Sequence, residues 1–437
     1  MEQQIQSQAG QAEQVQQADP RGPFLAGDRA LWIIVAILAA LSLLVVYSAT
    51  ASLAWKKHDG DMTHYIFNQI VFLMLAFAAI YVVHRTKYKV YYHLAPIVYV
   101  ISLLMMGATF FMGVNLNDAQ RWLRIPFLGV TVQPSDLLRI TTVMILARQL
   151  AIRQGNILKM KLLPRLLHWG GRHGAQNREI LVSTTIPLLL PVALSCGMIF
   201  FSNLSTSVIT FTTCLVMLFI GRVSVREIVR LVVVTLAAMT LVVGVMYAGN
   251  IGRSHTWVNR IKDFMPKTEK VERGQDVDKK PGTDQTQVEN AKIAVATGGL
   301  FGKGPGKSTQ RAKLPNSFSD FAFAFIVEEY GFFAAFAVML LYLWIFVRSI
   351  RIFRQCGTAF PALLVLGLGL MIVLQALVNM LVSVHLMPVT GQTLPLVSLG
   401  GSSLVFTAIA LGMMLGVSRQ AQERTLEQPK GESILEK

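Results

Sequence analysis

The sequence predicts an all-α polytopic membrane protein with about ten transmembrane helices. Of its 437 residues, 53% are hydrophobic and only 15% are charged, and the mean hydropathy is +0.51. Apolar runs of about 20 residues, the length that crosses a hydrocarbon core about 30 Å thick, recur along the chain. This composition excludes a soluble globular protein.

The ten apolar runs follow one another through short polar loops, with one exception. The exception is residues 249–319, a large loop between the seventh and eighth runs. In the fourth run, Asp136 and Arg139 are spaced to pair on one helix face, and Pro134 suits a first helical turn with Gln133 or Thr131 at its cap. We expect helices at residues 30–53, 65–84, 94–113, 133–151, 180–201, 205–221, 228–248, 321–347, 359–385 and 395–418.

The placement of Lys and Arg predicts which side of the membrane each loop faces. Sixteen of these residues lie in the loops 85–93, 148–179, 222–230 and 348–354, against four in the opposite short loops. Basic loops stay in the cytoplasm. In the cytoplasmic (inner) membrane, both termini are therefore expected on the cytoplasmic side and the large loop on the outer side. Contacts with anionic membrane lipids explain the net charge of +16 better than nucleic acid does, because the charges are scattered over separate loops.

The chain is expected to form one membrane domain between two polar tails. Residues 1–28 are rich in Gln and Ala and predict a disordered cytoplasmic tail. The membrane domain covers 29–418, and 419–437 form a second cytoplasmic tail. The three cysteines form neither a disulfide framework nor a set spaced for metal binding.

Three acids near the eighth apolar run are the first candidates for function. Asp320 stands at the start of this run, and Glu328 and Glu329 lie inside it. A charge in the hydrocarbon layer costs several kcal/mol unless it faces protein or water. The two glutamates fit a functional site or a structural ion pair, whereas Asp320 is shallow enough to meet a water-borne substrate.

The glycine-rich stretch Gly298–Gly306 and the basic residues after it predict an anion site outside the bilayer. The stretch differs from a nucleotide-binding phosphate loop because position 301 is Phe instead of Gly. Its backbone amides would cradle an anion together with nearby cations; the alternative is a flexible basic loop that touches lipid headgroups. The cations are Lys303, Lys307, Arg311 and Lys313.

The spacing of the acids limits the chemistry. Asp320 and Glu328 are eight residues apart, or about 12 Å on an unbroken helix, whereas a retaining glycosidase pair needs about 5–5.5 Å. One carboxylate suffices if the leaving group is already good, such as a diphosphate. The site then needs a base for the attacking hydroxyl and cations for the departing charge.

The segment Asn379–Leu404 interrupts an apolar stretch with two prolines and three glycines. Broken backbone at membrane depth is tolerated where it is buried in protein or lines a wet cavity. We therefore expect a cavity here; a plain helix–loop–helix with small packing residues is the alternative.

These motifs occur in an order that resembles the SEDS family (shape, elongation, division and sporulation), and the resemblance covers most of residues 30–418. Within the family the chain is more similar to the division-type FtsW branch than to the elongation-type RodA branch. The matching stretches are RWL…QPS at Arg121–Ser135, GGLFGKGPG at Gly298–Gly306, LPNSFSDFAFAFIVEEYG at Leu314–Gly331 and LMPVTGQTLPLVSLGGSSL at Leu386–Leu404.

The resemblance implies an enzyme that polymerises lipid II into β-1,4 glycan strands at the outer face of the membrane during cell division. It implies Asp320 as the catalytic base, undecaprenyl diphosphate as the leaving group, and no certain cofactor, with Mg²⁺ or Mn²⁺ as an option. Its expected partners are a class B penicillin-binding protein transpeptidase and other membrane proteins of the division complex. Residues expected to bind substrate are Arg121, Trp122, Gln133, Ser135, Lys303, Lys307, Lys313, Ser319, Glu328, Glu329, Thr390, Ser398, Ser402 and Ser403.

Three alternatives stay open at the level of sequence. Broken helices with intramembrane charges are also typical of transporters, so a lipid II flippase is one alternative. The others are an elongation-type polymerase and a non-catalytic scaffold that recruits the transpeptidase.

Overall fold

The computed structural model describes residues 26–57, 63–116, 119–124, 131–157, 179–249, 258, 260, 264, 283–310 and 320–427. The predicted tail up to residue 25, Arg311, Lys313 and Ser319 lie outside the described residues.

All ten predicted apolar segments are helical. Among the residues that the structure describes, eight helices are long and apolar enough to cross a membrane. The other two are α5, which carries three charged residues, and α8, which has 17 residues; ten crossings therefore stay a prediction. The helices are α2 (Arg29–Lys57), α3 (Thr63–Arg85), α4 (Tyr88–Met112), α5 (Pro134–Ile152), α7 (Ile186–Ser202) preceded by the π-helical turn Leu181–Thr185, α8 (Leu204–Ile220), α9 (Val225–Ala248), α11 (Thr283–Gly298), α13 (Ala322–Gln355), α14 (Ala359–Ser383) and α15 (Gly401–Glu427).

The all-α prediction omitted a small antiparallel sheet. Strands β1 (Val114–Leu116), β2 (Ala119–Arg124) and β3 (Thr131–Val132) pair in the order β1-β2-β3 between α4 and α5. Their pattern could not reveal them, because strands of two to six residues are too short to show alternation.

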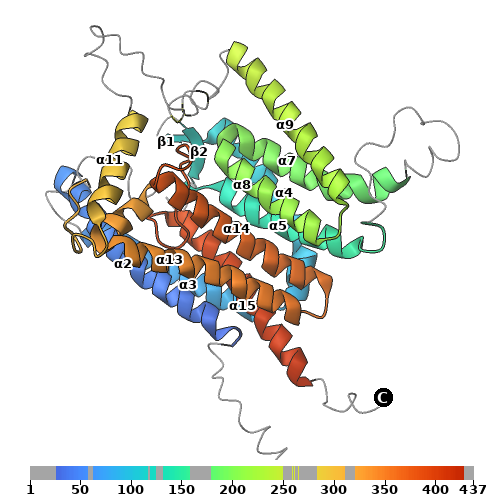
Figure 1. The fold of residues 1–437 in the computed structure, drawn as a ribbon. Helices are drawn as coiled ribbons and strands as arrows, with labels where there is room; N and C mark the ends of the chain where they lie inside the picture. Colours follow the sequence, from blue (N-terminus) through green and yellow to red (C-terminus); the bar gives the residue numbers. More distant parts are fainter. Residues whose placement is uncertain are drawn as a thin grey trace, which may run out of the picture.

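Helices α14 and α15 form the centre of the bundle (Figure 1), with 83% and 72% of their apolar windows buried. The corresponding window of α9 has no buried residue, so both faces of α9 would meet lipid. The apolar core joins residues from most of the helices around this centre.

Several predicted boundaries were wrong. Helix α4 begins at Tyr88, six residues before the predicted start, and α13 continues to Gln355, eight residues past the predicted end. The last helix begins at Gly401, six residues after the predicted start, and continues to Glu427. Residues 384–400 are irregular or form turns, as the prolines and glycines there predict. Asp28 belongs to the folded domain rather than the tail, because its carboxylate accepts the Leu31 N–H at 3.1 Å and pairs with Arg348.

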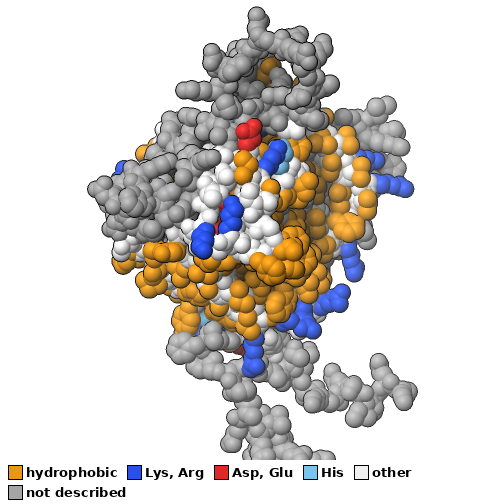
Figure 2. Space-filling model, turned by 60° about the vertical axis from the view of Figure 1, so that its left-hand side comes forward, with side chains coloured by type: hydrophobic (Ala, Val, Ile, Leu, Met, Phe, Trp, Pro, Cys, Tyr) orange, Lys and Arg blue, Asp and Glu red, His pale blue; other side chains and the backbone are white. Residues whose placement is uncertain are grey.

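The basic loops gather at one end of the bundle and the polar motifs at the other. At the basic end, Arg419 donates to the Arg85 carbonyl and Gln420 to that of Thr86. Figure 1 places α11 and the strands at the opposite end from the start of α14. On the face drawn in Figure 2, hydrophobic side chains form a broad band, with Lys and Arg side chains both along its lower edge and above it. The orientation of the molecule in the membrane stays a prediction.

Candidate active site

Asp320 lies half-buried where α13 begins, at the end of the bundle opposite the basic loops. Its neighbour Phe321 is 1% exposed and anchors the turn in a cluster that includes Ala291 and Ala294 of α11 and Val382 of α14. The small alanines let α11 approach closely. The carboxylate therefore stands on a fixed backbone, although it lies at a helix end.

Asn379 holds the backbone of Asp320 directly. Its side-chain Nδ2 donates to the Asp320 carbonyl at 2.9 Å and to the Gln392 carbonyl at 2.7 Å. Asn379 is completely buried, its bond to Gln392 is buried and its bond to Asp320 is partly buried. Losing these bonds would leave unsatisfied groups inside the protein. One amide thus joins the start of α13 to the irregular segment before α15. Sequence analysis placed Asn379 in the broken-helix motif but gave it no role.

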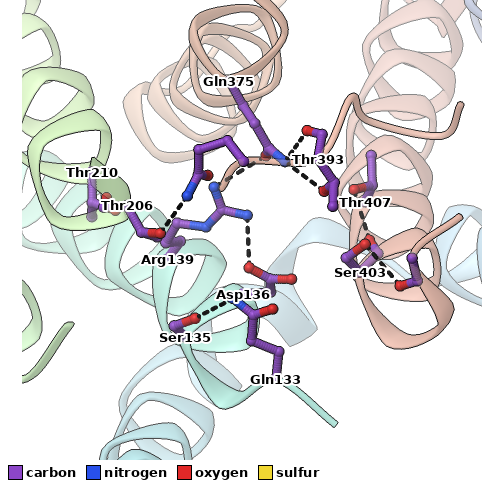
Figure 3. Close-up of polar contacts among 12 residues, drawn as sticks. Gln133, Ser135, Asp136, Arg139, Thr206, Thr210, Gln375, Thr393, Ser403 and Thr407 are labelled. Carbon is purple, nitrogen blue, oxygen red and sulfur yellow. Dashed lines mark hydrogen bonds and ion pairs between the residues drawn. The ribbon is translucent and has the colours of Figure 1, made fainter. Parts of the chain in front are cut away.

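A buried polar network continues from this point toward α5 (Figure 3). Arg139 pairs with Asp136 at 3.0 Å, as the spacing predicted, and also donates to Gln375 Oε1 at 3.0 Å. Gln375 Nε2 in turn donates to the Thr393 carbonyl at 2.9 Å. The network keeps the irregular segment fixed against α5 and α14, and a charged pair inside the bundle is tolerated because it is hydrogen-bonded.

The glycine-rich loop supplies backbone hydrogen bonds where α13 is interrupted. Gly331 has φ 81° and ψ −179°, which interrupts the helix. The N–H groups of Lys303 and Gly304 donate to the Glu328 and Glu329 carbonyls, both at 2.9 Å, while the Phe332 N–H donates to the Gly299 carbonyl at 3.0 Å. The loop therefore satisfies backbone groups that the break would leave unpaired in an apolar layer.

Only glycine permits this close approach. A Cβ at Gly298 would lie 2.2 Å from the Val327 carbonyl oxygen, and one at Gly302 would lie 2.3 Å from that of Glu329. Gly298 thus has a packing reason, and Gly302, with φ 78°, has both a packing and a conformational one.

The anion that this loop surrounds is the side chain of Glu328. The carboxylate is fully buried and accepts bonds from Lys303 Nζ at 2.8 Å, from the N–H and hydroxyl of Thr309, both at 2.9 Å, and from the Ser308 hydroxyl. Lys303 is therefore committed to an internal ion pair. These contacts give Lys303 and Glu328 a structural role, and the expectation that they bind substrate stays a prediction.

Glu329 is also paired inside the protein. It is 2% exposed and accepts a hydrogen bond from the Ser48 hydroxyl of α2. Of the two explanations left open for the glutamates, these contacts favour the structural one, a link between elements.

The remaining predicted residues divide between the interior and the surface. Thr390, Ser398 and Ser135 are buried, and Ser398 and Ser403 accept or donate bonds within their own segment. The Gln133 N–H donates to Ser402 Oγ at 3.2 Å, while its side chain donates to Ser135 at 3.0 Å. Lys307 is exposed, Trp122 is half-buried on β2, and Arg121 lies on the same strand. Through these contacts, the buried hydroxyls stabilise the segments around the site.

Two cations that sequence analysis missed lie near the start of α13. Arg260 donates to the Val389 carbonyl at 3.3 Å, and Val389 packs on the cluster that holds Phe321. Lys292 is exposed on α11 next to Ala291. Burial and then the charge of Lys292 lower the pKa of His385, which follows α14. Both residues are far from Asp320 in sequence, so no local sequence pattern linked them to it.

The described residues offer no protein site for a metal ion: none of their His, Cys, Asp and Glu side chains form a group of three or more. Mg²⁺ often binds through one carboxylate and substrate phosphates. An ion at this site would therefore depend on a diphosphate substrate for most of its ligands.

The chain is a polytopic helical membrane protein, and it is a member of the family described as "Cell cycle protein" (FTSW_RODA_SPOVE), whose model matches residues 28–423. It is 27% identical over 418 residues to a probable peptidoglycan glycosyltransferase FtsW of Neisseria gonorrhoeae (90% of this chain, 85% of the relative). It is also 27% identical to stage V sporulation protein E of Bacillus subtilis (90% of this chain, 98% of the relative).

Solved structures share the fold. A chain from a structure on the coordination of polymerization and crosslinking by a peptidoglycan synthase complex matches 91% of this chain and 99% of its own length, with TM-score 0.65 and 22% identity. The rod shape determining protein RodA of Thermus thermophilus matches 92% of this chain and 99% of its own, with TM-score 0.59 and 23% identity.

Proposed function

We propose that this chain is a peptidoglycan glycosyltransferase that polymerises lipid II, with Asp320 as the general base. The observation that carries the proposal is the position of Asp320: a half-buried carboxylate at the start of α13, fixed through its carbonyl by Asn379. Membership of the family and relatives named as probable peptidoglycan glycosyltransferases support the reaction class.

In the proposed reaction, the 4-hydroxyl of the terminal N-acetylglucosamine on one lipid-linked chain loses its proton to the Asp320 carboxylate. The oxygen attacks the anomeric carbon of N-acetylmuramic acid on the other chain. The bond from that carbon to the diphosphate breaks, and undecaprenyl diphosphate leaves with the bonding electrons. A single displacement from an α-linked diphosphate gives a β-1,4 bond with inversion, so one carboxylate is enough.

The departing diphosphate needs positive charge close to Asp320. Because Lys303 is paired with Glu328, we assign this role to Arg260 and Lys292, together with Lys307 on the loop surface. The lipid tails would lie against apolar helices, and α9 offers a helix with no buried face.

We also propose that the site faces the outside of the cytoplasmic membrane and that the chain works with a class B penicillin-binding protein. The basic loops at the far end of the bundle support the orientation. The similar fold of a chain from a peptidoglycan synthase complex supports the partner.

The test is lipid II polymerisation by the purified protein in complex with its transpeptidase partner. We expect Asp320→Asn to lower the rate by about 10³-fold or more, because an amide cannot accept the proton. Glu289→Gln on α11 removes an exposed acid near the same end and serves as the matched control. Polymer of unchanged length and rate from Asp320→Asn would refute the role of this residue.

Two further experiments separate the remaining alternatives: one tests a flippase against a polymerase, and the other tests a division role against an elongation role. Vesicles with lipid II in the inner leaflet only would show outside accessibility without polymer if the chain transported its substrate. A fluorescent fusion at mid-cell would support division, whereas sidewall labelling would support elongation.

A further inference from the structure

At the basic end of the bundle, two adjoining hollows lie where α2 begins and α13 ends. Their volumes are about 680 Å³ and about 620 Å³, and they share Trp344 and Arg348. Trp344 is 44% exposed and Val347 is 58% exposed. The hollows are therefore apolar on the side toward the bundle's middle, where lipid chains would lie.

The other side of the hollows carries a surplus of positive charge. Arg29, Arg351 and Arg354 line them and are exposed, and no ion pair or hydrogen bond joins their side chains to another described residue. Asp28 is the one acid among the lining residues. It is 3% exposed, and Arg348 neutralises it through a pair that includes a 2.8 Å bond.

The pairing of Asp28 with Arg348 matters for binding. The two adjoining hollows form one groove, and this pair fixes its floor between two helices that are far apart in sequence. It also leaves the three exposed arginines without a negative neighbour among the lining residues. An anion would therefore meet a preformed positive rim beside the aromatic side chain of Trp344.

We infer that this groove binds an anionic phospholipid, with the headgroup phosphate against Arg29, Arg351 and Arg354 and an acyl chain along Trp344 and Val347. Basic hollows between transmembrane helices at the cytoplasmic side are suited to such headgroups, and each nearby Lys or Arg attracts them. A free phosphate ion would use the arginines alone and leave the apolar wall exposed, so the lipid fits both halves of the groove. This site lies at the opposite end from Asp320 and is independent of the proposed reaction.

The test uses the full-length protein in phosphatidylcholine nanodiscs and reads Trp344 fluorescence as the difference between wild type and Trp344→Phe. Brominated lipids quench a nearby indole. Brominated phosphatidylglycerol is expected to quench Trp344 at a mole fraction at least about tenfold lower than brominated phosphatidylcholine does. In Arg351→Gln/Arg354→Gln this preference should fall by roughly tenfold or more, because two charges are lost.

The matched control is Lys89→Gln/Arg226→Gln, which removes two exposed charges from other loops at the same end and should retain the preference. Equal quenching by both lipids, or an equal loss in the control variant, would overturn the inference. Displacement of the lipid by inorganic phosphate would make the groove a phosphate site. Loss of quenching on binding the transpeptidase partner would make it a protein docking surface. Either result overturns the lipid assignment.

Discussion

The amide of Asn379 bonds two carbonyls that belong to different segments, at Asp320 and Gln392. In Asn379→Leu, a side chain of similar size removes both donors. The carboxylate of Asp320 would then be less precisely placed, and misplacement near a reacting centre costs rate more than binding. We expect kcat to fall by about 10–100-fold while KM changes by less than about threefold, measured as lipid II polymerisation.

A control on the same helix separates positioning from general damage. Ser383 donates only to the Asn379 carbonyl one turn earlier in α14, so Ser383→Ala should keep kcat within about twofold. A rise in KM with unchanged kcat in Asn379→Leu would instead mean that Asn379 contacts the substrate.

Cys356 follows the end of α13 and gives a pH-dependent test of local burial. Burial raises the pKa of its thiol to about 11, and the nearby charge of Arg424 opposes this only in part. Because the thiolate is the reactive form, alkylation of Cys356 at pH 8 should be about 100-fold slower than that of a model thiol with pKa 9, and should rise until the pH exceeds 11.

The measurement is maleimide labelling in a Cys196→Ala/Cys214→Ala background, followed by mass spectrometry. Labelling at pH 8 as fast as that of a free cysteine peptide would show that the end of α13 is open.

At the scale of single residues, the sequence predicted local pairs but not distant ones. The Asp136–Arg139 pair follows from spacing within one helix. The Lys303–Glu328 pair joins a loop to a helix across 25 residues, and nothing in the local pattern distinguishes a lysine that binds substrate from one that neutralises a buried acid. Asn379 and Arg260 were missed for the same reason: only the tertiary fold brings Asn379 to Asp320 and Arg260 to Val389.

At the scale of elements, the glycine-rich loop and the break in α13 act as one unit. Gly331 has φ 81°, and a Cβ there would lie 2.4 Å from the Gly302 nitrogen. Gly331→Ala should therefore destabilise the protein by about 2 kcal/mol or more, through both strain and overlap. Thermal unfolding in detergent measures this. Gly244→Ala in α9, where no atom lies within 4 Å, should leave the transition unchanged or raise it slightly.

Equal transition temperatures for the two glycine variants would mean that the loop is not packed on α13. The sequence predicted the helix and the glycine motif separately, but not that one completes the other. Its estimate of about 12 Å between Asp320 and Glu328 assumed an unbroken helix. Because α13 begins at Ala322 and Phe321 is non-helical, Asp320 lies just outside the helix, and the separation of the two acids stays a prediction.

The ion pair inside this unit gives a second test at the same scale. Lys303→Met leaves the Glu328 carboxylate buried with its Ser308 and Thr309 donors only, and Glu328→Gln leaves a half-buried ammonium group. Each single variant should lose stability, but Lys303→Met/Glu328→Gln should lose less than the two losses added together, by roughly 1 kcal/mol or more. Strict additivity in a double-mutant cycle would show that the pair contributes nothing.

At the scale of the whole molecule, composition and hydropathy predicted the fold class and the position of all ten helical segments. Charge asymmetry predicted a basic end. The small sheet and the shift of α15 escaped prediction, because short strands and proline-rich turns carry little periodic signal. The burial of α14 could not be predicted from its own sequence, because it arises from the other helices that surround it.

The predicted orientation of the molecule rests on the charge of its loops, and the orientation decides whether Asp320 can meet an outer-leaflet substrate. Lys87, between α3 and α4, lies at the basic end, and Lys307 lies on the exposed surface of the glycine-rich loop. In a variant without native cysteines, Lys307→Cys should react with a membrane-impermeant maleimide in intact spheroplasts, while Lys87→Cys should react only after lysis. Labelling of Lys87→Cys in intact cells, with Lys307→Cys protected, would place Asp320 on the cytoplasmic side. Undecaprenyl-linked precursor in the outer leaflet would then be out of its reach, so this one measurement tests the topology and the proposed chemistry together.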